Sequence, residues 1–268
     1  MNKKNYSNYK NKQKNYNFWL DRLKKNKGHL VCSKDVRLNN LENDFMVKNI
    51  KKNKSILEIG CGNAVLLKKL TLKKPKYYLG TEFVKELTEY NKKTIKKKNI
   101  FFESLDMTLV NNKTFKRKFD YIISKRAIQN VLSKKLQLKS IDNLGFFLKK
   151  GGKMLLMESS INAQKNINKY RKIFNLHKIT PPWHNLFLDD EILKKYRFKN
   201  VKLKKIENFS SNFYFITRII YAAYAKLKNI KVNFTDPLNI IASSINKKIL
   251  SEDFSQIKLY VFIKKNEM

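Results

Sequence analysis

The sequence predicts an α/β protein with a doubly wound, mostly parallel, seven-stranded Rossmann-like sheet. Short apolar runs alternate with helix-length segments between residues 55 and 158, which gives one strand and one helix per step. A polar side chain, acidic in most cases, stands at or just beyond the end of each run. Moreover, 268 residues of which 42% are hydrophobic can bury one substantial core. We therefore expect a single domain.

Residues 1–25 are strongly polar, and we expect a basic, disordered tail there. The first 17 residues contain no acid and almost no aliphatic side chain. Their tyrosines could stack on nucleic-acid bases, but a solubilising role is favoured. The domain would then span residues 26–268, with the apolar cluster at 18–23 packed on it.

Two helices are well marked. The first is expected over residues 33–49, where Leu38 and Phe45 belong to an apolar stripe at helical spacing and Ser33 is a suitable N-cap. The second is expected over residues 133–148, where a Lys-Lys-Gly-Gly sequence ends it.

Five apolar runs are interpreted as parallel strands joined by right-handed crossovers. They cover residues 55–59, 77–81, 100–103, 121–124 and 153–158. In such a sheet, ligands bind beyond the carboxyl ends of the strands, at the point where the strand order reverses. The polar residues at those ends are Glu58, Glu82, Asp106, Ser124 and Glu158. The sequence therefore predicts that they share one site.

The last third of the chain departs from this alternation. Strands are expected at residues 200–206 and 256–263 as an antiparallel hairpin, but a long insertion separates them. Within it, residues 210–227 have an apolar stripe that predicts a helix. We interpret the segments 160–196 and 209–253 as cap elements that form a lid over a substrate pocket. A membrane-surface helix is not favoured, because the polar face carries few charges.

Residues 56–67, with the sequence ILEIGCGNAVLL, form a strand followed by a nucleotide-type ligand loop. Gly60 and Gly62 let the backbone turn sharply and approach a ligand, and the next helix presents free N–H groups to the same space. A dinucleotide-binding loop would need a third glycine where Val65 stands. In addition, Glu58 would repel a pyrophosphate, whereas it suits a ligand with an ammonium or sulfonium group.

The loop resembles motif I of the class I S-adenosylmethionine-dependent methyltransferases, with Ala64 in place of the third glycine. The resemblance implies S-adenosylmethionine as the cofactor. In that family the residue matching Glu82 binds both ribose hydroxyls, and one near Asp106 meets the adenine amino group; Glu103 or Ser104 could take the latter place. It also implies that the helix at the start of the domain covers the mouth of the site. The cofactor-binding residues expected from it are Glu58, Gly60, Cys61, Gly62, Glu82, Asp106, Ser124 and Arg37.

Motifs that would indicate a nucleic-acid substrate are missing. Nucleic-acid amino methyltransferases carry an Asn/Asp-Pro-Pro-aromatic sequence after the fourth strand, where this chain has Ser-Lys-Arg at 124–126. The similar Thr-Pro-Pro-Trp sequence at 180–183 comes too late in the chain. No Pro-Cys pair exists to provide the nucleophile of cytosine-C5 methylation, and no metal site is predicted. Without these motifs, the chain resembles a small-molecule methyltransferase of a bacterial type, acting on oxygen or nitrogen.

His184 is the predicted general base. Among the three histidines, only His184 lies in a turn between Trp183 and Asn185, beside the expected lid. A packing or capping role is the alternative. The residues expected to contact substrate are Arg126, Glu158, Trp183, Tyr214 and Arg218.

The formal net charge of +38 would ordinarily suggest a nucleic-acid partner. However, Lys outnumbers Arg by 52 to seven, whereas phosphate and base recognition favours Arg. The spread of Lys, Asn and Ile along the chain favours a compositional bias of an AT-rich genome. Two alternatives to a small-molecule enzyme stay open: an RNA or DNA methyltransferase, and a non-catalytic protein of the same fold.

The cellular location is predicted from cysteines and hydropathy. Cys32 and Cys61 are the only cysteines, which is not a disulfide framework, and this favours a reducing cytoplasm. No apolar stretch resembles a signal peptide or reaches the length of a membrane span.

Overall fold

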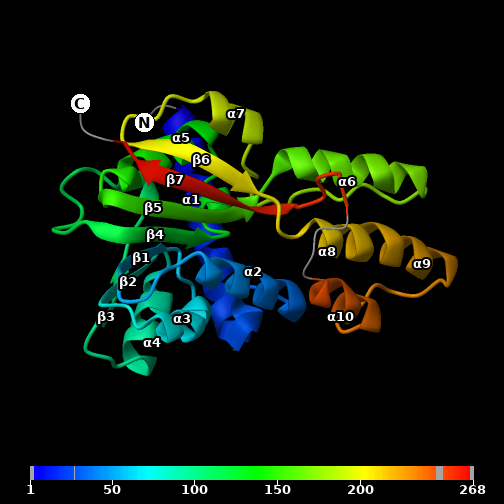
Figure 1. The fold of residues 1–268 in the computed structure, drawn as a ribbon, viewed down its shortest axis with the longest axis horizontal. Helices are drawn as coiled ribbons and strands as arrows, with labels where there is room; N and C mark the ends of the chain where they lie inside the picture. The colour runs from blue at the N-terminus through cyan, green and yellow to red at the C-terminus, as the bar shows by residue number, and fades with distance from the viewer. Residues whose placement is uncertain (1–2, 27, 246–249, 266–268) are drawn as a thin grey trace.

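The computed structural model describes residues 3–26, 28–245 and 250–265, and it confirms the predicted fold (Figure 1). Seven strands form one sheet in the order β3-β2-β1-β4-β5-β7-β6. The strands are β1 (Ser55–Ile59), β2 (Tyr77–Glu82), β3 (Ile100–Ser104), β4 (Phe119–Lys125), β5 (Leu148–Ser159), β6 (Val201–Glu207) and β7 (Ile257–Lys264).

The first five strands are parallel, and β7 pairs antiparallel with both β5 and β6. The chain moves outward from β1 through β2 to β3, then returns to the other side of β1 with β4. The strand order therefore reverses between β1 and β4. The loops that follow these two strands diverge to opposite faces, which opens a crevice at their carboxyl ends.

Helices cover both faces of the sheet. On one face α2 (Val36–Lys48) and α3 (Val65–Leu70) pack around Ile56 and Ile123, while α5 (Lys134–Gly145) and α7 (Asp190–Lys195) pack on the opposite face around Leu57 and Ile122. Because both faces are covered, β1 is buried at all five positions from Ser55 to Ile59, and three of them are apolar, without alternation. α4 (Lys85–Thr94) joins β2 to β3. Among the described residues, no helix is both long and apolar enough to cross a membrane.

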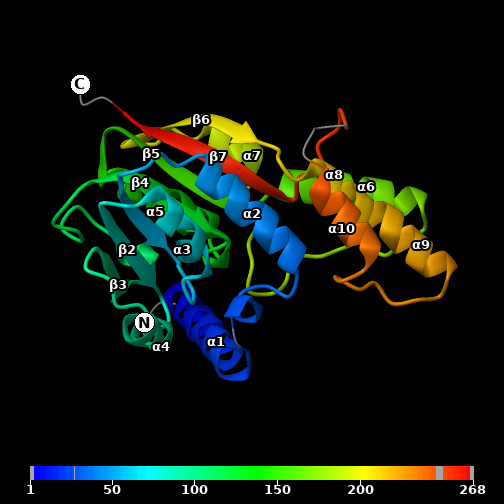
Figure 2. The same cartoon turned by 60° about the horizontal axis from the view of Figure 1, so that its bottom comes forward.

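The N-terminal segment differs from the disordered tail expected at 1–25, because the structure has a helix there, α1 (Lys3–Lys25). Its second half packs on the domain: Tyr16, Trp19, Leu20 and Leu23 contact a cluster around Val84 and Leu87. Figure 2 shows α1 lying beside α4 and near the start of α2. The helix is held by these tertiary contacts, which composition does not reveal.

Two predicted helix ends are corrected. α2 begins at Val36, and its N-cap is Asp35, whose carboxylate accepts from the backbone N–H of Leu38 at 3.0 Å. Ser33, the expected cap, instead donates to the backbone carbonyl of Asp35. α5 follows its N-cap Ser133, where the helix was expected to begin, but it ends at Gly145, and Leu148 already belongs to β5. The apolar run 146–148 crosses from helix to strand, so its periodicity could not mark the boundary.

The insertion between β6 and β7 is helical, as predicted. One long helix is built from α8 (Ser211–Phe215), the π-helical turn η5 (Ile216–Ile220) and α9 (Tyr221–Leu227), and α10 (Pro237–Ser244) follows. Asp236 caps α10, with Pro237 in its first turn. Together with α6 (Ile161–Ile173), these helices form the end of the molecule farthest from β3 (Figure 1).

Candidate functional site

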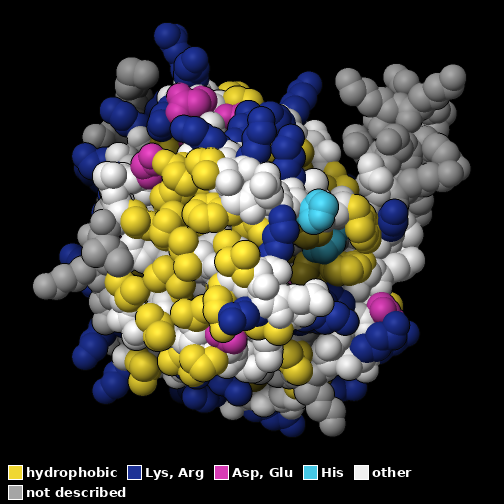
Figure 3. Space-filling model, turned by 90° about the vertical axis from the view of Figure 1, so that its right-hand side faces the viewer, with side chains coloured by type: hydrophobic (Ala, Val, Ile, Leu, Met, Phe, Trp, Pro, Cys, Tyr) yellow, Lys and Arg dark blue, Asp and Glu magenta, His cyan; other side chains and the backbone are white. Residues whose placement is uncertain are grey.

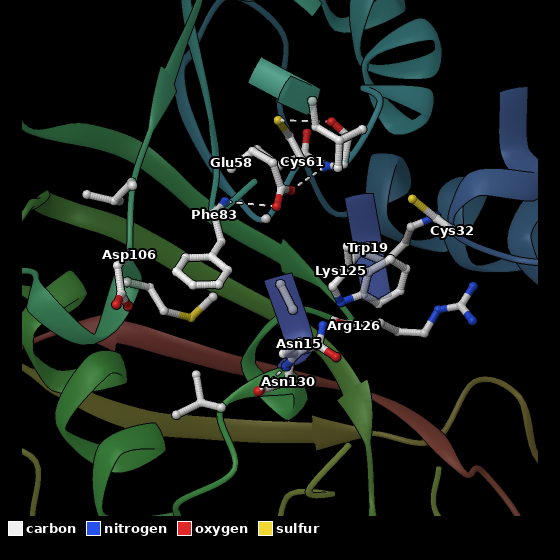
Figure 4. A pocket seen from close by; sticks show the side chains of 18 of the residues that line it. Asn15, Trp19, Cys32, Glu58, Cys61, Phe83, Asp106, Lys125, Arg126 and Asn130 are labelled. Carbon is white, nitrogen blue, oxygen red and sulfur yellow. Dashed lines mark hydrogen bonds between the residues drawn. The ribbon is translucent and has the colours of Figure 1, made fainter. Parts of the chain in front are cut away.

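A cavity opens at the carboxyl ends of β1, β2 and β4, at the predicted reversal of strand order (Figure 4). It is enclosed by the loops after four strands, by α1 and by the region around α2. Its principal polar lining residues are Lys12, Asn15, Asn39, Glu58, Asn63, Glu82, Asp106, Thr108, Lys125, Arg126 and Asn130.

The glycine loop forms one wall of the cavity. Gly60 has φ +67°, and a Cβ on it would stand 2.2 Å from the Cβ of Ala127, so no other residue fits there. At Gly62, φ is +55° and a Cβ would meet the sulfur of Cys32 at 2.7 Å. Ala64 is also left-handed, at φ +57°, just before α3. With Ala64 in place of the third glycine, the backbone still adopts the left-handed conformation, and the alanine carries the strain of that conformation.

Glu82, at the end of β2, ties two loops together. Its carboxylate accepts from the backbone N–H of Gly62 at 2.8 Å and from that of Phe83, also at 2.8 Å. Burial raises the pKa of this carboxyl, and the backbone donors oppose the shift. The side chain is thus fixed beside the glycine loop while it lines the cavity.

Glu58 lies inside β1 and reaches the same cavity. Its Oε2 accepts from the hydroxyl of Tyr78 at 2.6 Å, within the buried layer between β1 and β2. Burial raises the pKa of Glu58 to about 7, and the hydroxyl of Tyr78 opposes the shift. A cationic ligand group would favour the ionised form of this side chain.

Asp106 marks the far end of the cavity. Its carboxylate accepts from the backbone N–H of Thr108 at 2.9 Å and pairs with Nζ of Lys12 at 2.6 Å. The two alternatives, Glu103 and Ser104, are exposed and do not line the cavity. The structure thus brings Asp106, rather than its neighbours, together with Glu58, Glu82, Gly60, Cys61 and Gly62.

α1 provides a wall of the cavity that the sequence reasoning missed. Lys12, Asn15 and Trp19 line it, and Asn15 donates to the backbone carbonyl of Asn130 at 2.9 Å. On the outer side of the helix, the hydroxyl of Tyr16 donates to Glu86 at 2.5 Å. Lys12, Asn15 and Trp19 are separated by three and four residues, which places them on one face of the helix. This spacing is the sequence feature that could have indicated a shared surface.

Two basic side chains, those of Lys125 and Arg126, lie at the end of β4 and just after it. Nζ of Lys125 donates to Oδ1 of Asn39 at 2.6 Å, and Arg126 pairs with the fully buried Glu42 at 2.9 Å. Burial lowers the pKa of Lys125, and Glu42 opposes the shift. Arg126 has φ +57°, which turns the chain sharply beneath Gly60. Asn39 and Glu42, both on α2, were not predicted from sequence.

Ser124 and Glu158 were predicted for the site, but neither lines the cavity. Glu158 is fully buried, and its Oε1 accepts from the hydroxyl of Ser124 at 2.9 Å and from the backbone N–H groups of Ala127 and Ile128. Burial raises the pKa of Glu158 to about 7, although these donors favour the carboxylate. The pair thus holds the turn after β4.

His184 and Trp183 also lie outside the cavity lining. The imidazole of His184 stacks on Phe18 of α1 at 4.2 Å between ring centroids, and it contacts the edge of Trp19. Burial lowers the pKa of His184 to about 4. The predicted general base is therefore part of an aromatic cluster behind α1, and half-exposed Trp183 belongs to the same cluster.

The remaining predicted residues serve other contacts. Arg37 is exposed on α2 and does not reach the cavity. Arg218 pairs with Asp35 at 3.0 Å, and Tyr214 is buried between the insertion and the domain. None of the described residues in 160–196 or 209–253 lines the cavity, so these segments do not form the expected lid. α1 takes that position instead.

Comparison with known proteins identifies the type of domain. A family model described as a methyltransferase domain matches residues 50–200. No curated protein sequence matches the chain.

Several solved structures share the fold. They include a TehB-like S-adenosylmethionine-dependent methyltransferase from Corynebacterium glutamicum (13% identity, 84% of this chain and 88% of that chain, TM-score 0.51). A second is the N-methyltransferase NodS from Bradyrhizobium japonicum with S-adenosylhomocysteine (10% identity, 94% and 99%, TM-score 0.56). A third is phosphoethanolamine N-methyltransferase 1 from Haemonchus contortus (14% identity, 95% and 49%, TM-score 0.56).

Proposed function

The chain belongs to the class I S-adenosylmethionine-dependent methyltransferases, and from this membership we propose that it methylates a nitrogen or oxygen atom of a small molecule. S-adenosylmethionine is the cofactor. When bound, it supplies a methyl group on a sulfonium, which a nucleophile displaces in line. The protein's own task is to hold both reactants in line and to exclude water.

The residues around the cavity fit this cofactor. Gly60 leaves no side chain between the backbone and the cavity, so a ligand can approach the loop closely. Glu82 is fixed by backbone donors and would accept from the ribose hydroxyls, while Asp106 would meet the adenine. Glu58 would face the cationic amino acid end. These assignments follow the family pattern, and the placement of the side chains at one cavity supports them.

The acceptor side is proposed to lie at Asn15 and Asn130. Both amides donate through Nδ2, Asn15 to the carbonyl of Asn130 and Asn130 to the carbonyl of Arg126, which orients their Oδ1 atoms. Both Oδ1 atoms are buried and accept no hydrogen bond within the described part of the chain. A buried acceptor without a donor costs about 1–3 kcal/mol. This observation carries the proposal, because an amine or alcohol would supply the missing N–H or O–H groups.

Nitrogen is favoured as the methyl acceptor. No histidine is among the described residues that line the cavity, and its carboxylates are the three assigned to the cofactor. A neutral amine needs no base before it attacks, whereas an alcohol does. Alignment by Asn15 and Asn130 would then be sufficient for reaction.

A nucleic-acid substrate is the second candidate, and the net charge of +38 favours it. α1 favours the small molecule instead, since its contacts with Asp106 and Asn130 close the cavity on that side. The two are distinguished by incubating the purified protein and labelled S-adenosylmethionine with a metabolite extract and, separately, with total RNA. Label transferred to compounds that survive nuclease treatment supports our proposal, and label only in RNA contradicts it.

The acceptor site is tested once a labelled product is available. Asn130→Ala should raise the acceptor KM by about tenfold, the effect of one lost hydrogen bond, with cofactor affinity nearly unchanged. Asn112→Ala, at an exposed asparagine away from the cavity, is the matched control. An equal KM in both variants would remove Asn130 from the acceptor site.

A further inference from the structure

The end of the molecule formed by the insertion carries an unusual share of exposed apolar side chains. More than half of the large hydrophobic side chains that are exposed in the described residues lie in the segments 173–174 and 220–241. Leu227 is the most exposed of these, at 85%. We name this surface the apolar face. Its residues are Ile173, Phe174, Ile220, Tyr224, Leu227, Ile230, Val232, Phe234, Ile240 and Ile241.

The apolar face is one continuous surface. The loop after α9 folds back onto it, since the backbone N–H of Asn233 donates to the hydroxyl of Tyr221 at 3.0 Å. The end of α6 is joined to α9 by Lys226, which donates to the carbonyl of Asn175 at 2.7 Å. Figure 3 shows hydrophobic side chains gathered over this end of the molecule, with Lys and Arg around them.

The charge around the apolar face is mostly positive, although Asp236 lies within its segment and Glu252 contacts Tyr170 of α6. Residues 161–178 contain no acid, and residues 215–245 contain only Asp236. The carboxylate of Asp236 caps α10 by accepting from the backbone N–H of Leu238 at 2.9 Å. The exposed lysines of these two segments are Lys165, Lys169, Lys172, Lys178, Lys226, Lys228 and Lys231.

We propose that the apolar face is a peripheral docking surface for an anionic lipid bilayer. The sequence disfavoured a membrane-surface helix at 210–227 because that helix has few charges of its own, but the fold places the lysines of α6 and of the loop after α9 beside it. Exposed aliphatic and aromatic side chains enter the boundary between headgroups and acyl chains, and surrounding lysines are attracted to anionic lipids. A second copy of the chain fits less well, because two faces rimmed by lysine repel each other. Nucleic acid also fits less well, because seven of the ten side chains of the apolar face are aliphatic and offer no plane for bases to stack on. The surface lies apart from the cavity, whose lining includes none of the residues of the apolar face.

The proposal is tested by sedimentation with vesicles made of phosphatidylglycerol and phosphatidylcholine in equal parts. The double variant Leu227→Ser/Ile241→Ser should lower the vesicle partition coefficient by about tenfold or more, since each residue loses its apolar burial in the bilayer. Leu72→Ser/Leu109→Ser is the matched control, because Leu72 and Leu109 are 71% and 69% exposed but lie away from the apolar face. All four side chains are more than half exposed, so each variant should fold, and a thermal melt verifies this.

Three outcomes overturn the proposal. An equal partition coefficient for the two double variants means that the +38 charge alone attracts the vesicles. If the Leu227→Ser/Ile241→Ser variant loses heparin binding to the same extent as it loses vesicle binding, the apolar face is a general polyanion-binding surface. A dimer of the wild-type protein that this variant alone converts to a monomer, seen by sedimentation velocity, means that the face joins two copies. Methyl transfer without vesicles should be unchanged, so these outcomes are independent of the proposed substrate.

Discussion

Nζ of Lys12 lies 2.6 Å from a carboxylate oxygen of Asp106, so the N-terminal helix reaches across the cavity to the end of the third strand. Asp106 is the carboxylate that we propose meets the adenine of the cofactor. The cofactor cavity is thus bounded by a segment whose composition predicted disorder. We therefore expect the N-terminal helix to contribute to cofactor binding.

Deleting residues 1–17 should weaken S-adenosylmethionine binding and lower turnover. The deletion removes Lys12 and Asn15 from the cavity and opens it to water. Calorimetry and an activity assay measure the two effects.

A less disruptive variant, Lys12→Ala, should show a smaller loss than the deletion, because an ion pair with partly exposed partners contributes little by itself. Gln13→Ala, on the exposed side of α1, is its control, and unchanged binding in the deletion variant would contradict the assignment of α1 as a wall of the site.

Glu82→Ala should weaken cofactor binding by a few kcal/mol, roughly the value of two charge-assisted hydrogen bonds. The same carboxylate holds Gly62 and Phe83, so part of the loss would come from a looser loop. Calorimetry with S-adenosylmethionine measures the change. Glu103→Ala is the control, since Glu103 ends the adjacent strand but is exposed. If both variants bind as the wild type does, Glu82 has no role in binding the ribose.

His184→Ala should leave the pH dependence of turnover unchanged and lower the stability. The side chain is not in the cavity, and its removal unstacks Phe18 from the turn that follows Pro182. A rate loss of about 100-fold that recovers at high pH would restore the general-base hypothesis.

The same residue makes a prediction about stability. Its folded pKa of about 4 is below the ordinary value of 6.5, so between these values the unfolded chain binds more protons. The contribution of His184 to stability therefore decreases as pH falls from 6.5 toward 4, and His184→Ala should remove this part of the pH dependence. Thermal melts of the wild type and the variant between these pH values measure the difference.

The sheet could be predicted because its information is local. Each strand is a short apolar run, and the glycine loop between Gly60 and Gly62 has a conformation that few other residues allow. The contacts of α1 could not be predicted, since Lys12 and Tyr16 are ordinary polar residues until the fold brings Asp106 and Glu86 beside them.

The errors within the site have a similar cause. A carboxylate at a strand end can face the cavity, as Glu58 does, or turn inward to hold backbone N–H groups, as Glu158 does. The position along the strand is alike in the two cases. What distinguishes Glu158 is the turn after β4, which contains the left-handed Arg126 and whose N–H groups meet this carboxylate.

Cofactor affinity should increase with pH through neutrality, because of Glu58. Burial raises its pKa to about 7, so the carboxyl is largely protonated below that value, whereas a cationic ligand favours the ionised form. Binding should therefore release a proton, which calorimetry detects as a heat that varies with the ionisation enthalpy of the buffer. Glu58→Gln keeps an acceptor for the hydroxyl of Tyr78, so the fold should persist while the pH dependence is lost.

Glu58 also links pH to stability, with the opposite sign from His184. Between the ordinary carboxyl pKa of 4.5 and its value of about 7, the folded protein binds more protons at this site than the unfolded chain does. The stability contributed by Glu58 is therefore present at low pH and is lost as pH rises through this window. In Glu58→Gln, the free energy of unfolding should decline less over the same interval. If binding and unfolding of Glu58→Gln both keep the wild-type pH dependence, another group is titrating. Glu158, whose pKa burial also raises to about 7, would be the next residue to replace.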